Sequence, residues 1–258
     1  MTTQEKIYLP LIQSFKTENI DLYKNNLWIK PAAQTDFSGL FIPHYISKEY
    51  ESLEKKIFFV GQDTYEWVPL ANVFNLSEND YLIKNNSWPN NSKEILKWIN
   101  PYTFWNFVCK LQLSMNGFAS DLSAIDEQKE RLLNGIGWGN LYSLELPETI
   151  RKYGEEFNSL FDHNIYNRLL ESSCNISKLK YILDAFKPDY VVILAWKYVE
   201  NWYFDELEVE YIENECIPDL LSCYKINNTK VFWTYHPQAL CRKSQDLNEL
   251  TNYIINRL

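Results

Sequence analysis

The chain has little glycine and proline, with 7 and 10 among its 258 residues, which argues against a linker-rich organisation. Its longest uninterrupted apolar run, Tyr190 to Trp196, is far shorter than the roughly 20 residues that a membrane span requires. The first residues lack the basic-then-apolar layout of a secretory signal peptide. These absences predict a soluble protein of the cytoplasm without membrane contact.

Cysteine is scarce and unpaired. The five cysteines are Cys109, Cys174, Cys216, Cys223 and Cys241. No two form a CxxC pair, and the odd count suits neither a disulfide framework nor a four-cysteine metal cluster. We expect buried free thiols in a reducing compartment, and the sequence implies no metal and no cofactor.

Positive charge is also in deficit. The net charge is −9 and the isoelectric point is near 5.0, the wrong sign for a protein that coats nucleic acid nonspecifically. Apolar residues make up 46% of the chain and aromatic residues 16%, enough for a sizeable core. The length suits one large α/β domain, or one such domain with an extension.

The charge is unevenly distributed. Residues 200–219 carry eight carboxylates and no Lys or Arg, whereas residues 230–245 carry Lys230, Arg242 and Lys243 and no acid. The acidic stretch is either a solvated insertion or a face that repels DNA or docks a basic partner. The basic stretch places local positive charge where a DNA contact would need it.

Hydrophobic periodicity predicts strands that alternate with helices. Strands are expected at 57–60, 136–142, 190–196 and 230–235, and helices at 4–15, from 91 onward, and at 102–115, 123–133, 177–186 and 246–258. This alternation predicts an α/β protein, a three-layer α/β/α fold with a short, mainly parallel central sheet. We expect an N-terminal extension over 1–50, packed on a domain over 51–258.

One predicted strand is followed directly by polar side chains that could take part in catalysis. Ile57-Phe58-Phe59-Val60 is typical of a buried strand, and Gly61 breaks it. Asp63 and Tyr65 then follow at the carboxyl end of the strand. In an open α/β sheet this is the edge where ligands bind.

This segment resembles a glycosylase motif. Gly61-Gln62-Asp63-Thr64-Tyr65 is similar to the Gly-Gln-Asp-Pro-Tyr-His motif of the uracil-DNA glycosylase superfamily, and His236-Pro237-Gln238-Ala239-Leu240 is similar to its His-Pro-Ser-Pro-Leu motif. Both segments occur in the family's order, and each follows a predicted strand. The resemblance implies a monofunctional DNA glycosylase that flips uracil or another modified base out of DNA and hydrolyses the bond to deoxyribose.

Hydrolysis of an N-glycosidic bond leaves positive charge on the sugar and negative charge on the departing base. A fixed carboxylate can stabilise the cation and orient water, and a hydrogen-bond donor can stabilise the base anion. The resemblance implies that Asp63 is this carboxylate and His236 this donor. Their alternative roles are a turn residue after Gly61 and a turn histidine before Pro237.

The resemblance also implies base contacts. Gln62 would bind the base, and Tyr65 would crowd its C5 position and exclude thymine. Phe74 would stack on the flipped base, with Trp67 as a competitor. For Tyr65 and Phe74, packing in the core is the alternative.

An asparagine amide would read the base, and the sequence offers two. Asn140 follows the glycine-punctuated strand, whereas Asn134 ends a helical pattern where Asn-Gly is typical of a cap. We favour Asn140.

Leu240 keeps the place of the family's wedge, and we expect it at the tip of a loop, where it would enter the base stack beside the phosphate contacts of Arg242 and Lys243. A leucine folded onto the core is its alternative. The loops depart from the family at Thr64, Glu66 and Gln238-Ala239, so the sequence does not specify which base is excised.

Two other functions stay open. One is a glycosylase for unusual modified bases in foreign DNA, and the other is a non-catalytic binding module, which the low isoelectric point favours. We expect a monomer with DNA as its partner.

Overall fold

The computed structural model describes residues 1–24, 40–62, 71–86, 89, 91–99, 103–142, 172, 176, 178–195, 201–242 and 246–257. By its internal contacts the chain forms two compact units. Unit 1 comprises Met1–Pro43, Asp63–Ser87 and Asn140–Ala185, and unit 2 comprises His44–Gln62, Trp88–Gly139 and Phe186–Leu258.

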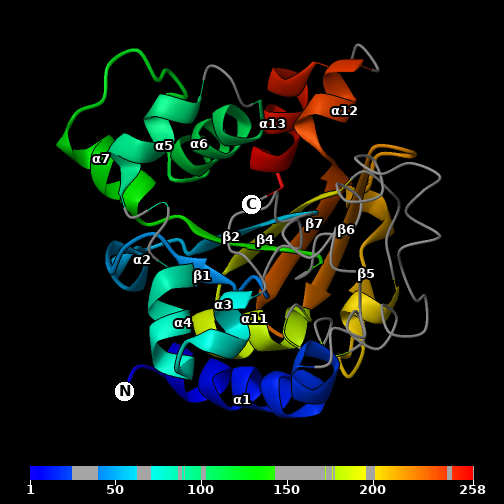
Figure 1. Ribbon diagram of the computed structural model, residues 1–258. Helices are drawn as coiled ribbons and strands as arrows, with labels where there is room; N and C mark the ends of the chain where they lie inside the picture. The colour runs from blue at the N-terminus through cyan, green and yellow to red at the C-terminus, as the bar shows by residue number, and fades with distance from the viewer. Residues whose placement is uncertain are drawn as a thin grey trace. The chain divides into compact units, whose positions relative to one another are not determined.

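A seven-stranded sheet holds the fold together, with strand order β1-β3-β2-β4-β7-β6-β5 (Figure 1). The strands are β1 His44–Tyr45, β2 Ile57–Gly61, β3 Gly137–Asn140, β4 Tyr190–Ala195, β5 Glu210–Tyr211, β6 Leu221–Ile226 and β7 Thr229–Tyr235. The α/β class is therefore confirmed. The first strand of the sheet, β1, lies within the first 50 residues, and the expected domain boundary near residue 50 stays a prediction.

The centre of the sheet is parallel and its edges are antiparallel. β2 pairs with β4 and β4 pairs with β7 in parallel. β3 lies beside β2 and runs in the same direction (Figure 1). β1 pairs antiparallel with β3 at one edge, and β6 and β5 follow β7 antiparallel at the other.

Burial explains why these strands form. All five residues of β2 are buried, as are all residues of β4 after Tyr190, which is typical of parallel strands covered on both faces. Burial alternates along β6 and disappears in β5. The sheet therefore changes from core to surface toward the β5 edge.

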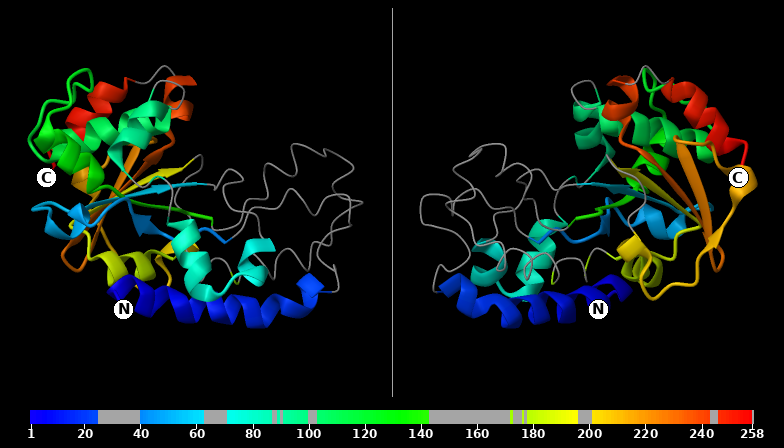
Figure 2. Two further views of the ribbon diagram at one scale, coloured as in Figure 1. Left: turned by 60° about the vertical axis from the view of Figure 1, so that its left-hand side comes forward. Right: turned by 90° about the vertical axis from the view of Figure 1, so that its right-hand side faces the viewer.

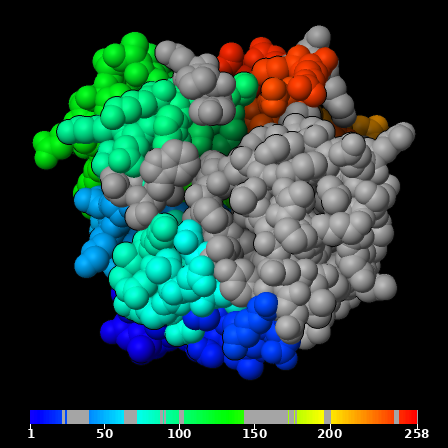
Figure 3. Space-filling model, in the orientation of Figure 1, coloured from blue at the N-terminus to red at the C-terminus, as the bar shows by residue number. Residues whose placement is uncertain are grey.

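Five helices of unit 2 lie side by side in a layer over one face of the sheet (Figures 1 and 2). They are α5 Ser92–Trp98, α6 Thr103–Met115, α7 Glu127–Asn134, α12 Pro237–Arg242 and α13 Leu247–Ile255. In the space-filling view, the surfaces of the green and the orange-to-red helices adjoin (Figure 3). α6 is the central member, in contact with the other four. The short helix α2 Glu49–Ser52 contacts α7.

Side-chain caps set several helix starts. The Asn91 side chain accepts from the Glu94 backbone N at 3.1 Å, so α5 begins where the capping sequence predicts. The expected polar helix over 123–133 begins later, at Glu127, because Asp126 is the cap and accepts from the Lys129 backbone N at 2.8 Å.

Unit 1 contains α1 Thr3–Lys24, α3 Ala71–Asn75 and α4 Glu78–Asn85, which contact one another, and most of α11 Leu179–Phe186. α1 buries Tyr8, Ile12, Phe15 and Asn19, one stripe at helical spacing. It extends nine residues beyond the helix expected over 4–15.

The packing around position 137 explains why β3 has a glycine there. A Cβ atom there would lie 2.5 Å from Cδ2 of Phe58 and 2.9 Å from Cε2 of Tyr50. The close approach of two aromatic rings, rather than a turn, therefore requires glycine in this strand.

Candidate functional site

Parallel strands place their carboxyl ends along one edge of the sheet. β2 ends at Gly61 and continues to Gln62, β3 ends at Asn140, and β7 continues to His236. The chain leaves β2 for β3 on one side and returns to β4 on the other, so the strand order reverses at β2 and β4. Ligands of open α/β sheets bind outside such a switch point.

The register sets the level of these residues. Ile193 of β4 lies opposite Val60, and Ala195 lies opposite Tyr235. Continued by two residues, this register brings Gln62 level with Ala195, and His236 follows one residue later. β2 and β7 are two strand spacings apart, about 10 Å. The segments that carry the two motifs therefore end at one edge of the sheet.

His236 is the residue before helix α12 and caps it. Its Nδ1 accepts a hydrogen bond from the Gln238 backbone N at 3.2 Å, and its backbone N donates to Ala195 O at 2.7 Å. The turn that was the alternative role of His236 is thus a helix start, with Pro237 at the first helical position, where its missing N–H is harmless.

The ring of His236 is held in one protonation state. Burial lowers the pKa of His236 to about 4, so the imidazole is neutral at pH 7. Because Nδ1 accepts from a backbone N–H, the single ring proton of the neutral form resides on Nε2. His236 is therefore a neutral N–H donor.

Phe104 of α6 packs on this imidazole and was not predicted from the sequence. The two ring centroids are 5.6 Å apart with an interplanar angle of 14°, a stacked arrangement. Phe104 also meets Trp105 edge to face at 5.3 Å, which fixes its own orientation. Four of the first six residues of the expected helix 102–115 are aromatic, and nothing in that pattern distinguishes Phe104.

Asn140 ends β3 with a buried amide. The residue is 3% exposed, and its Nδ2 has no hydrogen-bond partner within the described part of the chain. An unsatisfied buried donor costs about 1–3 kcal/mol, and most proteins avoid it. A ligand that accepts from this amide would remove the cost.

Asn134 has a structural role. Its Oδ1 accepts from the Ser92 backbone N at 2.7 Å, which ties the end of α7 to the first residue of α5. Of the two asparagines considered as base readers, Asn140 is the one whose amide Nδ2 lacks a hydrogen-bond partner among the residues that the structure describes.

Several predicted site residues lie outside the described residues, namely Asp63, Thr64, Tyr65, Glu66, Trp67 and Lys243. Gln62 is described and half-buried. Phe74 lies on α3 in unit 1, half-buried, with its ring centroid 6.2 Å from that of Phe15 on α1. Phe74 therefore contributes to the packing of α3 on α1.

The expectation that Leu240 sits at a loop tip is wrong. Leu240 lies in α12 and is fully buried, because residues 237–242 form a helix that contacts α6 and α13. A wedge must be exposed to enter the base stack, so the alternative of a leucine folded onto the core holds. Arg242 at the end of the same helix is exposed.

Lys230 lies far from the other two cations of the basic stretch along the chain and belongs to a strand. It lies near the start of β7, six residues and about 20 Å along the strand from His236. Its Nζ lies 3.0 Å from Glu215 Oε2, so its positive charge is paired with a carboxylate of the same unit.

The acidic stretch is largely exposed, which both of its interpretations require, so the choice between them stays a prediction. Six of its described carboxylates are exposed: Asp205, Glu206, Glu208, Glu210, Glu213 and Asp219. Glu215 is the exception, half-buried and paired with Lys230. Tyr203 and Phe204 anchor the stretch, with ring centroids 5.9 Å and 5.7 Å from that of Trp233.

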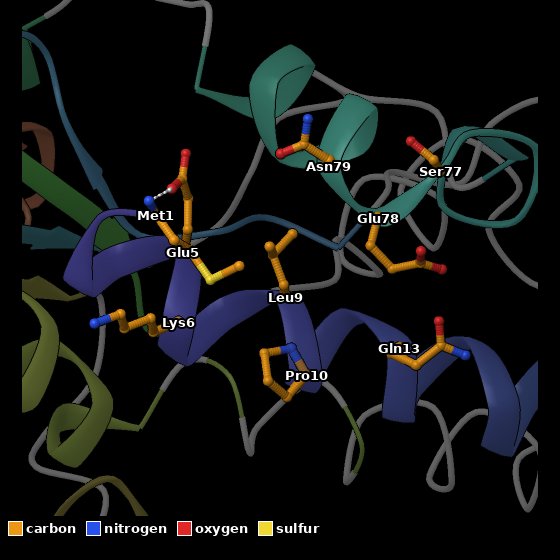
Figure 4. A pocket seen from close by; sticks show the side chains of 9 residues that line it. All are labelled: Met1, Glu5, Lys6, Leu9, Pro10, Gln13, Ser77, Glu78 and Asn79. Carbon is orange, nitrogen blue, oxygen red and sulfur yellow. Dashed lines mark ion pairs between the residues drawn. The ribbon is translucent and has the colours of Figure 1, made fainter.

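Two cavities lie elsewhere. In unit 1, α1 and α4 border an open groove of about 400 Å³ with Leu9 and Pro10 among its lining residues, where the Met1 amino group lies 4.0 Å from Glu5 (Figure 4). In unit 2, a charged cavity of about 560 Å³ lies at the amino ends of β4 and β7, lined by Asp189 and Lys230 among others. Neither involves the motif segments.

Within the described ranges, no three His, Cys, Asp or Glu side chains are grouped to hold a metal ion. None of the described helices is long and apolar enough to cross a membrane. Comparison of the chain with protein-family models, curated proteins and solved structures finds no match.

Proposed function

We propose that the protein is a DNA glycosylase that flips uracil or another modified base out of DNA and hydrolyses its N-glycosidic bond. The proposed fold is that of the uracil-DNA glycosylase superfamily, a three-layer α/β/α arrangement around the parallel strands. The proposal rests on the two motif resemblances and on the arrangement of their segments at one edge of the sheet.

The state of His236 is the observation that carries the proposal. A departing pyrimidine gains negative charge on its oxygen, and a donor placed there stabilises the transition state. His236 is neutral at pH 7 and carries its proton on Nε2. It stabilises the base anion by hydrogen bonding without transferring its proton. Removal of such a donor typically lowers the rate about 10²–10³-fold.

Asp63 and Asn140 complete the proposed chemistry. Asp63 follows Gln62 at the end of β2, where its carboxylate would orient the attacking water and stabilise the developing cation on the sugar. The Nδ2 of Asn140, which has no hydrogen-bond partner among the described residues, would donate to an acceptor on the edge of the flipped base, and its Oδ1 would accept from a base N–H.

The test is release of free base under single-turnover conditions. Duplex and single-stranded oligonucleotides containing uracil, and a panel with modified pyrimidines, are incubated with wild type and with Asp63→Asn, and the free base is quantified by mass spectrometry. We expect release by wild type from at least one substrate and none by Asp63→Asn, with the two proteins equally stable.

Asp121→Asn is the matched control, because Asp121 is exposed in the loop before α7 and an asparagine keeps the acceptor for the Ser123 backbone N. This variant should release base as wild type does. If wild type releases no base from any substrate but still binds the oligonucleotides, the protein is a non-catalytic binding module. Equal release by Asp63→Asn and wild type would remove Asp63 from the mechanism.

A further inference from the structure

We propose that Cys216 and Cys223 are a redox-active pair that closes reversibly into an intramolecular disulfide on reaction with a hydroperoxide. Cys216 follows the 3-10 helix η3 Glu213–Glu215, and Cys223 lies in β6. Both are free thiols in this structure. The proposal concerns this pair alone and is independent of the proposed function.

The two cysteines are already in contact. The Cys223 backbone N donates to Cys216 Sγ at 3.3 Å. Cys216 Sγ itself donates to Ile212 O at 3.2 Å. Burial, with a smaller contribution from the neighbouring Cys216, raises the pKa of Cys223 to about 12. An antiparallel bridge between Ile217 and Leu221 folds the chain back between them. Since Cβ of Cys223 is two bonds from the backbone N that contacts Cys216 Sγ, rotation of the two side chains brings the sulfurs toward each other.

The remaining described cysteines have no such neighbour. Cys109 is fully buried in α6, and burial raises the pKa of its thiol. Cys241 is exposed on α12. Within the described chain, therefore, one pair of thiols combines contact with partial access to solvent.

The environments assign different roles to the two sulfurs. Cys216 is half-buried, so a small hydroperoxide can reach it, whereas Cys223 is fully buried. The Cys216 thiol gives up its proton as its sulfur attacks the peroxide O–O bond and becomes a sulfenic acid; the leaving oxygen takes up that proton and departs as water when the peroxide is hydrogen peroxide. The Cys223 sulfur then attacks the Cys216 sulfur, and its proton leaves with the hydroxyl group as a second water. Two thiols are oxidised and one peroxide is reduced.

The pair lies where the segment before β6 is hydrogen-bonded to the end of α13. Cys216 O accepts from Tyr253 Oη at 3.2 Å, and Glu215 O accepts both from Cys223 Sγ at 3.1 Å and from Arg257 Nε at 3.1 Å. Tyr253 and Arg257 belong to the last turn of α13 and the residues after it. A disulfide removes the S–H donor from Glu215 O, so oxidation alters how this end of the chain is held.

The test uses the reduced full-length protein with graded hydrogen peroxide, followed by alkylation of free thiols and a non-reducing peptide map. We expect one cross-linked peptide pair containing Cys216 and Cys223, with Cys109 and Cys241 still alkylated, and full reversal by dithiothreitol. Hydrogen exchange of residues 253–257 should differ between the two forms.

Variants separate the steps. Cys223→Ser should accumulate a Cys216 sulfenic acid that dimedone traps, and Cys223→Ala repeats this result if serine disturbs the buried site. Cys241→Ser is the matched control and should form the disulfide as wild type does. The proposal is overturned if Cys241 is oxidised while Cys216 and Cys223 both remain alkylated, or if the disulfide that forms includes any other cysteine.

Discussion

Protonation of His236 should destabilise the fold in a defined pH window. An ordinary histidine has a pKa near 6.5, whereas burial lowers that of His236 to about 4. Between these values the unfolded chain binds a proton that the folded protein does not bind. The free energy of unfolding therefore falls as pH decreases from about 6.5 to about 4. Above this window both states are neutral at His236, and below it both are protonated, so His236 contributes no further change.

The size of the effect follows from the difference in pKa. Since one pKa unit corresponds to about 1.4 kcal/mol, the contribution is at most about 3 kcal/mol. His236 is half-buried, and solvent screening reduces this value, so we expect a loss of about 1–3 kcal/mol on acidification from pH 7.5 to 4.

The assay compares urea unfolding of wild type and His236→Gln at pH 7.5, 6, 5 and 4, followed by tryptophan fluorescence. Other groups titrate equally in both proteins, so the difference between the two curves isolates His236. We expect wild type to lose about 1–3 kcal/mol more than the variant over this range. Parallel curves would refute the lowered pKa and, with it, the neutral donor at pH 7.

Two further predictions concern packing around the site. Phe104→Leu should expose the imidazole and raise the pKa of His236 toward 6.5, as measured by NMR titration. Phe104→Tyr should keep the ring stacked and the pKa low. Equal pKa values in the two variants would show that Phe104 does not shield His236. Gly137→Ala should lower the free energy of unfolding by about 1–3 kcal/mol, because the new methyl group would overlap Phe58 and Tyr50. A thermal unfolding midpoint equal to that of wild type would contradict this packing in β3.

The sequence predicted the centre of the fold better than its edges. β2, β4 and β7 appear as apolar runs because both faces are buried, and burial is the property that hydrophobicity records. β1 and β5 have two residues each and form through pairing with neighbours, which no local pattern records. β6 carries a signal that was missed. Its burial alternates, and Asn227-Asn228 forms a two-residue turn to β7 with Asn227 at φ 52°.

For the site residues, the sequence predicted which strand they follow better than it predicted their local conformation. The His-Pro segment does follow a core strand, as expected, but residues 237–242 form a helix rather than a loop. Pro237 at the first helical position was a start signal that the loop interpretation overlooked. Once this helix forms, Leu240 turns inward and Arg242 remains exposed. One local error in secondary structure thus reverses the exposure of the proposed wedge.

The two roles considered for His236, a turn residue and a donor, are compatible. As the cap of α12, His236 uses Nδ1 to accept the Gln238 backbone N–H, a structural function common to helix starts. That bond is also what confines the ring proton to Nε2, and the burial that accompanies it keeps the ring neutral. A histidine without the cap would exchange tautomers and would donate from Nε2 only part of the time. The helix that removes Leu240 from the surface therefore prepares His236 for the chemistry proposed here.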